Sequence, residues 1–92
     1  MSDRIIKYTI NIIDRIMELN TFVKNFAEQF EETDAANFTP QTKFREIEEW
    51  CSLTVMAIIG MADEVYHVRL TGDEMKASKT IEDVYNCVKS KV

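Results

Sequence analysis

Residues that make tight turns are scarce in this chain, which holds two glycines and one proline among 92 residues. Sheet-rich folds need more of them between strands, so the scarcity favours a fold built from helices. The length predicts one domain with a core of modest size. The net charge of −5 argues against a nucleic-acid binder, which would carry a basic surface, and fits a basic protein partner.

The reactive side chains exclude several kinds of site. The two cysteines, Cys51 and Cys87, match neither a disulfide framework nor a metal-binding spacing, which predicts a reduced, cytoplasmic protein. His67 is the only histidine, so a zinc site or a Ser-His triad has too few residues and we expect no enzyme. No run of 18 apolar residues occurs, and no membrane span is predicted.

Residues 3–32 contain neither glycine nor proline, and their apolar positions recur at helical spacing. One helix, or two nearly collinear helices, would place on one face Ile5, Ile12, Ile16, Leu19, Val23, Phe26 and Phe30. A second apolar line stops at Met17; it consists of Ile6, Ile10, Ile13 and Met17. We therefore predict a helical extension over residues 1–16 and a domain over residues 17–92, whose first helix covers residues 17–32.

The additional apolar line of the extension needs a partner surface. Residues 1–16 carry a net charge of +1, and residues 17–92 carry −6. We expect self-association of the chain into a homo-oligomer through residues 5–17, chiefly through Ile6, Ile10 and Ile13. The alternative is an appended segment without a dedicated role.

A long connection with one proline, residues 33–49, precedes the second predicted helix, and Phe38, Phe44 and Ile47 are expected to anchor it. The helix itself is predicted over residues 52–66. Its core side would hold Val55, Ile58, Ile59, Ala62, Val65 and Tyr66. Its other side mixes small, apolar and acidic residues, namely Leu53, Met56, Ala57, Gly60, Asp63 and Glu64. That side is either a docking face or a second buried face.

Two short elements complete the predicted all-α fold. Residues 73–77 suit one helical turn anchored by Met75. Thr80 is a predicted N-cap of the last helix, with Glu82 and Asp83 in its first turn, where negative charge suits the helix dipole. The predicted core stripe of that helix consists of Ile81, Val84, Tyr85 and Val88.

Ser52 is the candidate for covalent chemistry. It ends the long connection and begins a helix, so its hydroxyl would lie beside backbone N–H groups that have no helical partner. An anion attached there is favoured by those donors and by the helix dipole. A phosphodiester on Ser52 is therefore physically sensible, and the alternative is a serine that only caps the helix.

Residues 17–92 resemble an acyl carrier protein. The family signature Asp-Ser-Leu stands at the start of the second helix, where this chain has Cys51-Ser52-Leu53. The flanking segments also fit: Phe44-Arg45-Glu46, Glu49-Trp50, Ile59, Asp63-Glu64-Val65-Tyr66, Thr71-Gly72-Asp73 and Lys79-Thr80-Ile81-Glu82-Asp83. Each short motif has little specificity, whereas the ordered set at these distances is fairly specific.

This resemblance implies a four-helix bundle with a short third helix. It implies that a phosphopantetheinyl transferase attaches 4′-phosphopantetheine from coenzyme A to Ser52, and that acyl intermediates, such as those of fatty acid or polyketide biosynthesis, are then held as thioesters. Such a carrier is not itself an enzyme. It also implies that basic patches on acyl-processing enzymes dock on Leu53, Met56, Asp63 and Glu64.

The chain departs from the family pattern at the signature itself. Cys51 replaces an aspartate, which removes about 0.5–2 kcal/mol of helix capping and a carboxylate beside the transferase's target. Thr54 and Ala57 occupy positions that are acidic in many carriers. Both departures leave open an unmodified or degenerate carrier that acts as a helical protein-interaction adaptor. A thiol at a helix start also allows a redox role for Cys51.

The sequence leaves open the roles of two further residues, Trp50 and His67. Trp50 either packs beneath the connection, which we favour, or flanks the arm on Ser52. His67 is expected at the surface, and contact with the arm or its cargo is the alternative.

Overall fold

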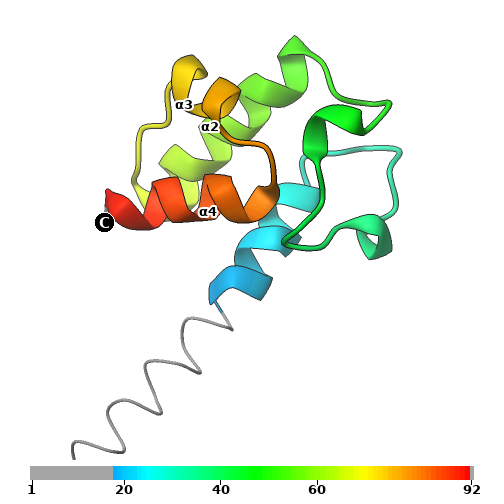
Figure 1. The fold of residues 1–92 in the computed structure, drawn as a ribbon, viewed down its shortest axis with the longest axis horizontal. Helices are drawn as coiled ribbons and strands as arrows, with labels where there is room; N and C mark the ends of the chain where they lie inside the picture. The colour runs from blue at the N-terminus through cyan, green and yellow to red at the C-terminus, as the bar shows by residue number, and fades with distance from the viewer. Residues whose placement is uncertain (1–17, 92) are drawn as a thin grey trace, which may run out of the picture.

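The fold is that of a computed structural model, and the residues that it describes are 18–91 (Figure 1). Residues 18–27 form the first helix, followed by the 3-10 helices η1 (Ala35–Asn37) and η2 (Phe44–Glu46). Three α-helices come next: α2 (Ser52–Tyr66), α3 (Gly72–Ala77) and α4 (Ile81–Ser90). Residues 18–91 contain no strand, so the all-α prediction is confirmed for them. The predicted extension, residues 1–16, and its self-association lie outside the described residues.

Aromatic side chains of the first helix hold the other helices together. Phe22 is fully buried, and its ring lies 5.5 Å from the rings of both Tyr66 on α2 and Tyr85 on α4. Phe26 is also fully buried and packs on Phe44 of η2, 5.5 Å away. Such tilted ring pairs contribute beyond the area that they bury. The apolar spacing of the sequence did not single out Phe22, although it lies at the centre of the core.

The first helix is shorter than predicted, because it ends near residue 27 and not at residue 32. Its last turn tightens, with the N–H of Phe30 donating to the carbonyl of Ala27 at 3.0 Å. The N–H groups of Glu31, Glu32 and Thr33 then donate to the carboxylate of Glu49 over 2.6 to 3.0 Å. A distant side chain thus offers these N–H groups an alternative to helical bonds.

The connection from the first helix to α2 is anchored as the sequence predicted. Phe38 and Phe44 are buried, and Ile47 packs against the core while partly exposed. Arg45 adds three hydrogen bonds to the end of α3 that the sequence did not predict: its guanidinium donates to the carbonyls of Met75, Lys76 and the C-cap Ser78. A cation at the C-terminal end of a helix satisfies free carbonyls and suits the dipole, so η2 and α3 are held together.

Both predicted helices after α2 are present, and each begins with a capping box. Thr71 and Glu74 exchange side-chain to backbone hydrogen bonds at the start of α3, and Thr80 and Asp83 do the same for α4. The anchor Met75 is buried, and so is the whole predicted stripe of α4: Ile81, Val84, Tyr85 and Val88. Within residues 18–91 no helix is long and apolar enough to cross a membrane.

The helix α2 has the predicted bounds but a partly different buried face. Ile58 and Ala62 are fully buried as predicted, and Met61, which was not assigned to the core, is 5% exposed. Val65 was expected in the core and is 50% exposed. The reason is its neighbourhood: Val65 lies along a groove whose other wall is polar, formed by Asn25, Glu28 and Gln29 of the first helix and the turn after it. Those side chains do not cover it.

Candidate functional site

Ser52 is the first residue of α2, and it is exposed. Its hydroxyl forms no hydrogen bond with any other group of residues 18–91. A capping serine would sit one position earlier and accept a bond from the first turn, so the structure does not support the interpretation of Ser52 as a cap. The side chain is instead free to be reached from solvent.

Trp50 fixes the chain just before this serine. Its ring packs on Phe44 at 4.7 Å and stacks on Phe30 and Phe26 at 6.2 and 6.5 Å. The preferred interpretation, packing beneath the connection, is therefore confirmed. Trp50 also lines the pocket that opens beside Ser52, so one face of the same ring contributes to the site.

Thr54 and Glu49 hold the start of α2 from within the molecule. The Thr54 hydroxyl donates to the carbonyl of Glu49 at 3.1 Å, and Thr54 is 7% exposed. The side chain of Thr54 therefore contributes nothing to the outer face of α2. Although desolvation raises the pKa of the Glu49 carboxyl, the hydrogen bonds from Thr33 and from the N–H groups of residues 31–33 lower it overall.

Cys51 occupies the N-cap position of α2 and forms no capping hydrogen bond there. Its thiol is exposed and lies 3.4 Å from the hydroxyl of Thr54. That hydroxyl, followed by the nearby N–H groups of Thr54 and Leu53, lowers the pKa of the thiol. Because no side-chain hydrogen bond caps the first turn of α2, an anion on Ser52 can also approach its N–H groups.

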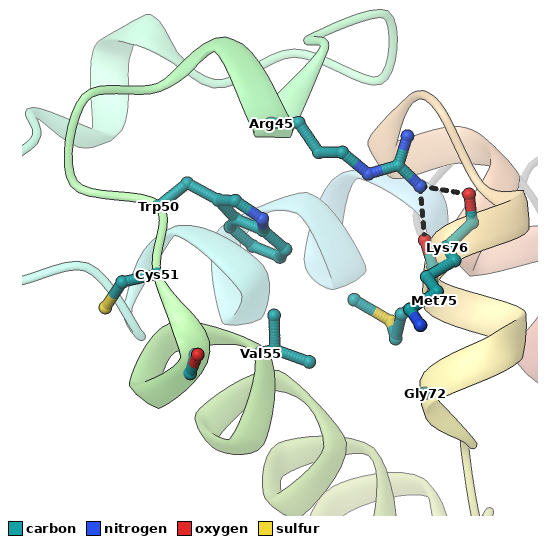
Figure 2. Close-up of a pocket in the computed structure, with 8 residues that line it drawn as sticks. Arg45, Trp50, Cys51, Val55, Gly72, Met75 and Lys76 are labelled. Carbon is teal, nitrogen blue, oxygen red and sulfur yellow. Dashed lines mark hydrogen bonds between the residues drawn. The ribbon is translucent and has the colours of Figure 1, made fainter.

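A pocket of about 330 Å³ opens between the start of α2 and α3 (Figure 2). It is lined from the α2 side by Trp50, Cys51, Ser52 and Val55, and from the other side by Arg45, Gly72, Met75 and Lys76. Figure 2 shows the thioether of Met75 pointing across the pocket towards Val55. The floor is thus apolar, and the charged residues of the lining are two cations, Arg45 and Lys76.

The outer face of α2 carries the residues that the resemblance assigned to docking. Leu53 is 78% exposed and Met56 is 70% exposed. Asp63 and Glu64 are exposed two turns further along the same helix. The alternative prediction, a helix buried on both sides, is therefore wrong. These two large apolar side chains are exposed in the first turns of the helix that begins at Ser52.

His67 lies at the far end of α2 from Ser52, about 20 Å along a helix of this length. It is exposed and adopts a left-handed conformation with φ of 56°, so it ends the helix. The prediction of a surface histidine is confirmed. The second cysteine, Cys87, is half-buried and donates to Glu74 at 3.2 Å; burial, followed by that carboxylate, raises the pKa of its thiol.

The sequence missed two residues of the site for the same reason. Arg45 acts on carbonyls about thirty residues away, and Glu49 acts on N–H groups more than fifteen residues before it. Neither contact leaves a local pattern in the sequence. No group of His, Cys, Asp or Glu side chains within residues 18–91 is placed to hold a metal ion.

Comparisons of the chain with protein-family models, with curated proteins and with solved structures found no match. The class of protein must therefore be inferred from the site. The site combines an exposed serine at the uncapped start of a helix, an apolar pocket beside it, and a helix face with apolar and acidic residues.

Proposed function

We propose that this chain is an acyl carrier protein, which holds acyl groups on 4′-phosphopantetheine attached to Ser52 and presents them to enzymes. The observation that carries the proposal is the setting of Ser52, whose exposed hydroxyl stands at the uncapped start of α2 and beside the pocket. In this proposal the chain itself catalyses no step.

The arrangement of helices supports the same class. We propose that the first helix, α2, the six-residue α3 and α4 form the four-helix bundle of a carrier, with α3 as its short third helix. The long connection lies between the first and second helices, where such a bundle needs it to cross. Arg45, which holds η2 against α3, keeps that connection in place beside the pocket.

The residues present fit the group that the proposal requires. Attachment joins the Ser52 oxygen to the phosphorus of the phosphopantetheine half of coenzyme A; adenosine bisphosphate leaves and the hydroxyl loses its proton. The resulting phosphodiester is an anion, and the uncapped N–H groups of α2 and the helix dipole favour it. When bound, the group supplies the thiol that carries the cargo. Trp50 and Val55 offer that cargo an apolar surface close to the attachment point.

The outer face of α2 suits brief contact with partner enzymes. Leu53 and Met56 give apolar area at the attachment end, and Asp63 and Glu64 give negative charge further along. Basic patches on acyl-processing enzymes and on the transferase would be attracted to this face and released again.

Mass measurement of the intact chain tests the proposal. Incubation with coenzyme A and a promiscuous phosphopantetheinyl transferase should add the mass of one phosphopantetheine group. Ser52→Ala should abolish the gain, whereas Ser90→Ala, which changes an exposed serine at the end of α4, should keep it. A chain that gains no mass with any transferase contradicts the carrier proposal.

One observation favours a second function, a helical protein-interaction adaptor without the arm. The exposed pair Leu53 and Met56 could bind a partner whether or not Ser52 is modified, and Cys51 removes the carboxylate that a transferase would meet. If the mass stays unchanged, the unmodified chain should nevertheless bind its partners. A Leu53→Ser, Met56→Ser double variant should lose that binding.

A further inference from the structure

We infer that the pocket beside Ser52 takes a short acyl group that ends in a carboxylate. The inference rests on the proposed function and names the class of cargo. Its basis is the composition of the lining, which is apolar next to Ser52 and cationic on the side of α3.

The two cations are notable because the protein is acidic. The chain has a net charge of −5, yet the lining contains Arg45 and Lys76 and no carboxylate. Within residues 18–91 neither forms an ion pair with an acidic side chain. Arg45 donates through one guanidinium nitrogen to backbone carbonyls at the end of α3, and no carboxylate neutralises its charge there.

The position of the cations distinguishes a cargo from the phosphodiester of the arm. The phosphodiester would be fixed on Ser52, at the start of α2, where backbone N–H groups are available. Lys76 lies at the C-terminal end of α3, and the guanidinium of Arg45 reaches that end from η2. Figure 2 places Trp50 and Cys51 on the other side of the pocket. An anion that reaches Arg45 and Lys76 would therefore be the far end of a group folded back into the pocket.

The size of the pocket limits the cargo. About 330 Å³ lies at the lower end of the range of ligand pockets, about 300–1,000 Å³. Met75 and Val55 narrow its middle from opposite sides. A chain of a few methylene groups would contact both side chains and bring a terminal carboxylate to the cations.

The experiment compares two cargoes of equal length on the full chain. Ser52 is loaded with phosphopantetheine that carries a glutaryl or a pentanoyl group through a stable amide, and intact mass confirms the loading. The two differ only in the end group, a carboxylate or a methyl. The shift of the Met75 methyl resonance, measured by NMR, should be larger for glutaryl, and added salt should reduce the difference.

Lys76→Gln tests the cation itself, and Lys24→Gln is its control, an exposed lysine of the first helix that does not line the pocket. The bound fraction of glutaryl should fall about two- to fivefold in Lys76→Gln, as expected for an exposed ion pair, and should not change in Lys24→Gln. Arg45 also holds α3, so its replacement would alter the fold together with the pocket.

On a chain whose Ser52 is correctly loaded, three results would overturn this inference and leave the carrier proposal intact. These are a pentanoyl shift as large as the glutaryl shift, equal effects of the two lysine variants, or a changed phosphorus resonance of the unacylated arm in Lys76→Gln. The last would mean that the cation serves the phosphodiester. Failure to load Ser52 would appear in the mass spectrum and would overturn the carrier proposal together with this inference.

Discussion

The helices α2 and α4 begin in opposite ways. Thr80 and Asp83 form a capping box at the start of α4, so side chains satisfy its first N–H groups. At the same position of α2, Cys51 forms no capping bond, and the helix is held instead through Thr54 and its bond to Glu49. The start of α4 is closed by its own sequence, whereas the start of α2 is left open beside Ser52.

The two helices also differ in how far their apolar residues are buried. All four apolar residues of the α4 stripe are buried, while α2 keeps Leu53 and Met56 in water. Burial of a large apolar side chain is worth about 1.5–3 kcal/mol, so α2 forgoes stability that α4 obtains. The comparison teaches that α4 maintains the fold, whereas α2 gives up stability at the end where the proposed modification of Ser52 and the proposed partners would need access.

The test with the largest expected effect on stability truncates one apolar side chain in each helix. Ile81→Ala in α4 should lower the free energy of unfolding by about 2–5 kcal/mol, because Ile81 is fully buried and leaves a cavity. Leu53→Ala in α2 should change it by less than about 0.5 kcal/mol, because Leu53 is 78% exposed. Urea denaturation measures both. Equal losses would mean that the outer face of α2 is covered in solution.

A second test replaces the N-cap residue of each helix. Thr80→Ala should destabilise the protein by about 1 kcal/mol through loss of the cap, while Cys51→Ala should have little effect. Cys51→Asp should stabilise the protein by about 0.5–2 kcal/mol, because a carboxylate can accept from the first turn. If Cys51→Ala is as damaging as Thr80→Ala, the thiol does cap α2 and the contrast between the helices disappears.

The C-terminal ends of the two helices offer a smaller test. His67 ends α2 with φ of 56°, while Lys91 ends α4 in the right-handed region. His67→Gly should stabilise the protein by about 0.5 kcal/mol, since glycine avoids the left-handed strain but loses more chain entropy. Lys91→Gly should destabilise it, because no strain is relieved and the lysine contact with Glu74 is lost. Thermal denaturation gives both signs, and a destabilised His67→Gly would show that this end is unstrained.

Much of the fold could be predicted from the sequence, because its signals are local. The bounds of α2 follow from apolar spacing, and the start of α4 follows from Thr80 with acidic residues in the first turn. The anchors Phe38 and Phe44 stand out in a polar connection. These features depend on residues within a few positions of each other.

The remaining features depend on contacts between distant parts of the chain. The first helix stops early because Glu49 binds the N–H groups that follow it, and Val65 is exposed because the facing side chains are polar. The setting of Ser52 could be predicted from its place between a connection and a helix. The pocket could not, because Arg45 and Met75 meet there only after folding.

The test with the smallest expected effect concerns pH. The capped start of α3 contains a carboxyl group with a strongly lowered pKa, that of Glu74, whereas the first turn of α2 contains no acidic residue. Lys91, followed by Cys87 and the N–H of Thr71, lowers the pKa of Glu74 from 4.5 to about 2. Because the folded pKa is depressed, Glu74 stabilises the protein above about pH 4.5, and this contribution is lost as the pH falls towards 2. The effect is modest, since the ion pair is partly exposed.

Glu74→Gln keeps the capping bonds to Thr71 but removes the charge, so denaturation by urea separates the two roles. The variant should be less stable than the parent chain at pH 7, and the difference should vanish near pH 2. Glu64→Gln on α2 is the control for the loss of one carboxylate, because Glu64 accepts no hydrogen bond within residues 18–91, and its effect at pH 7 should be smaller than that of Glu74→Gln. A Glu74→Gln deficit that persists at pH 2 would show that geometry, and not charge, makes this residue important at the start of α3.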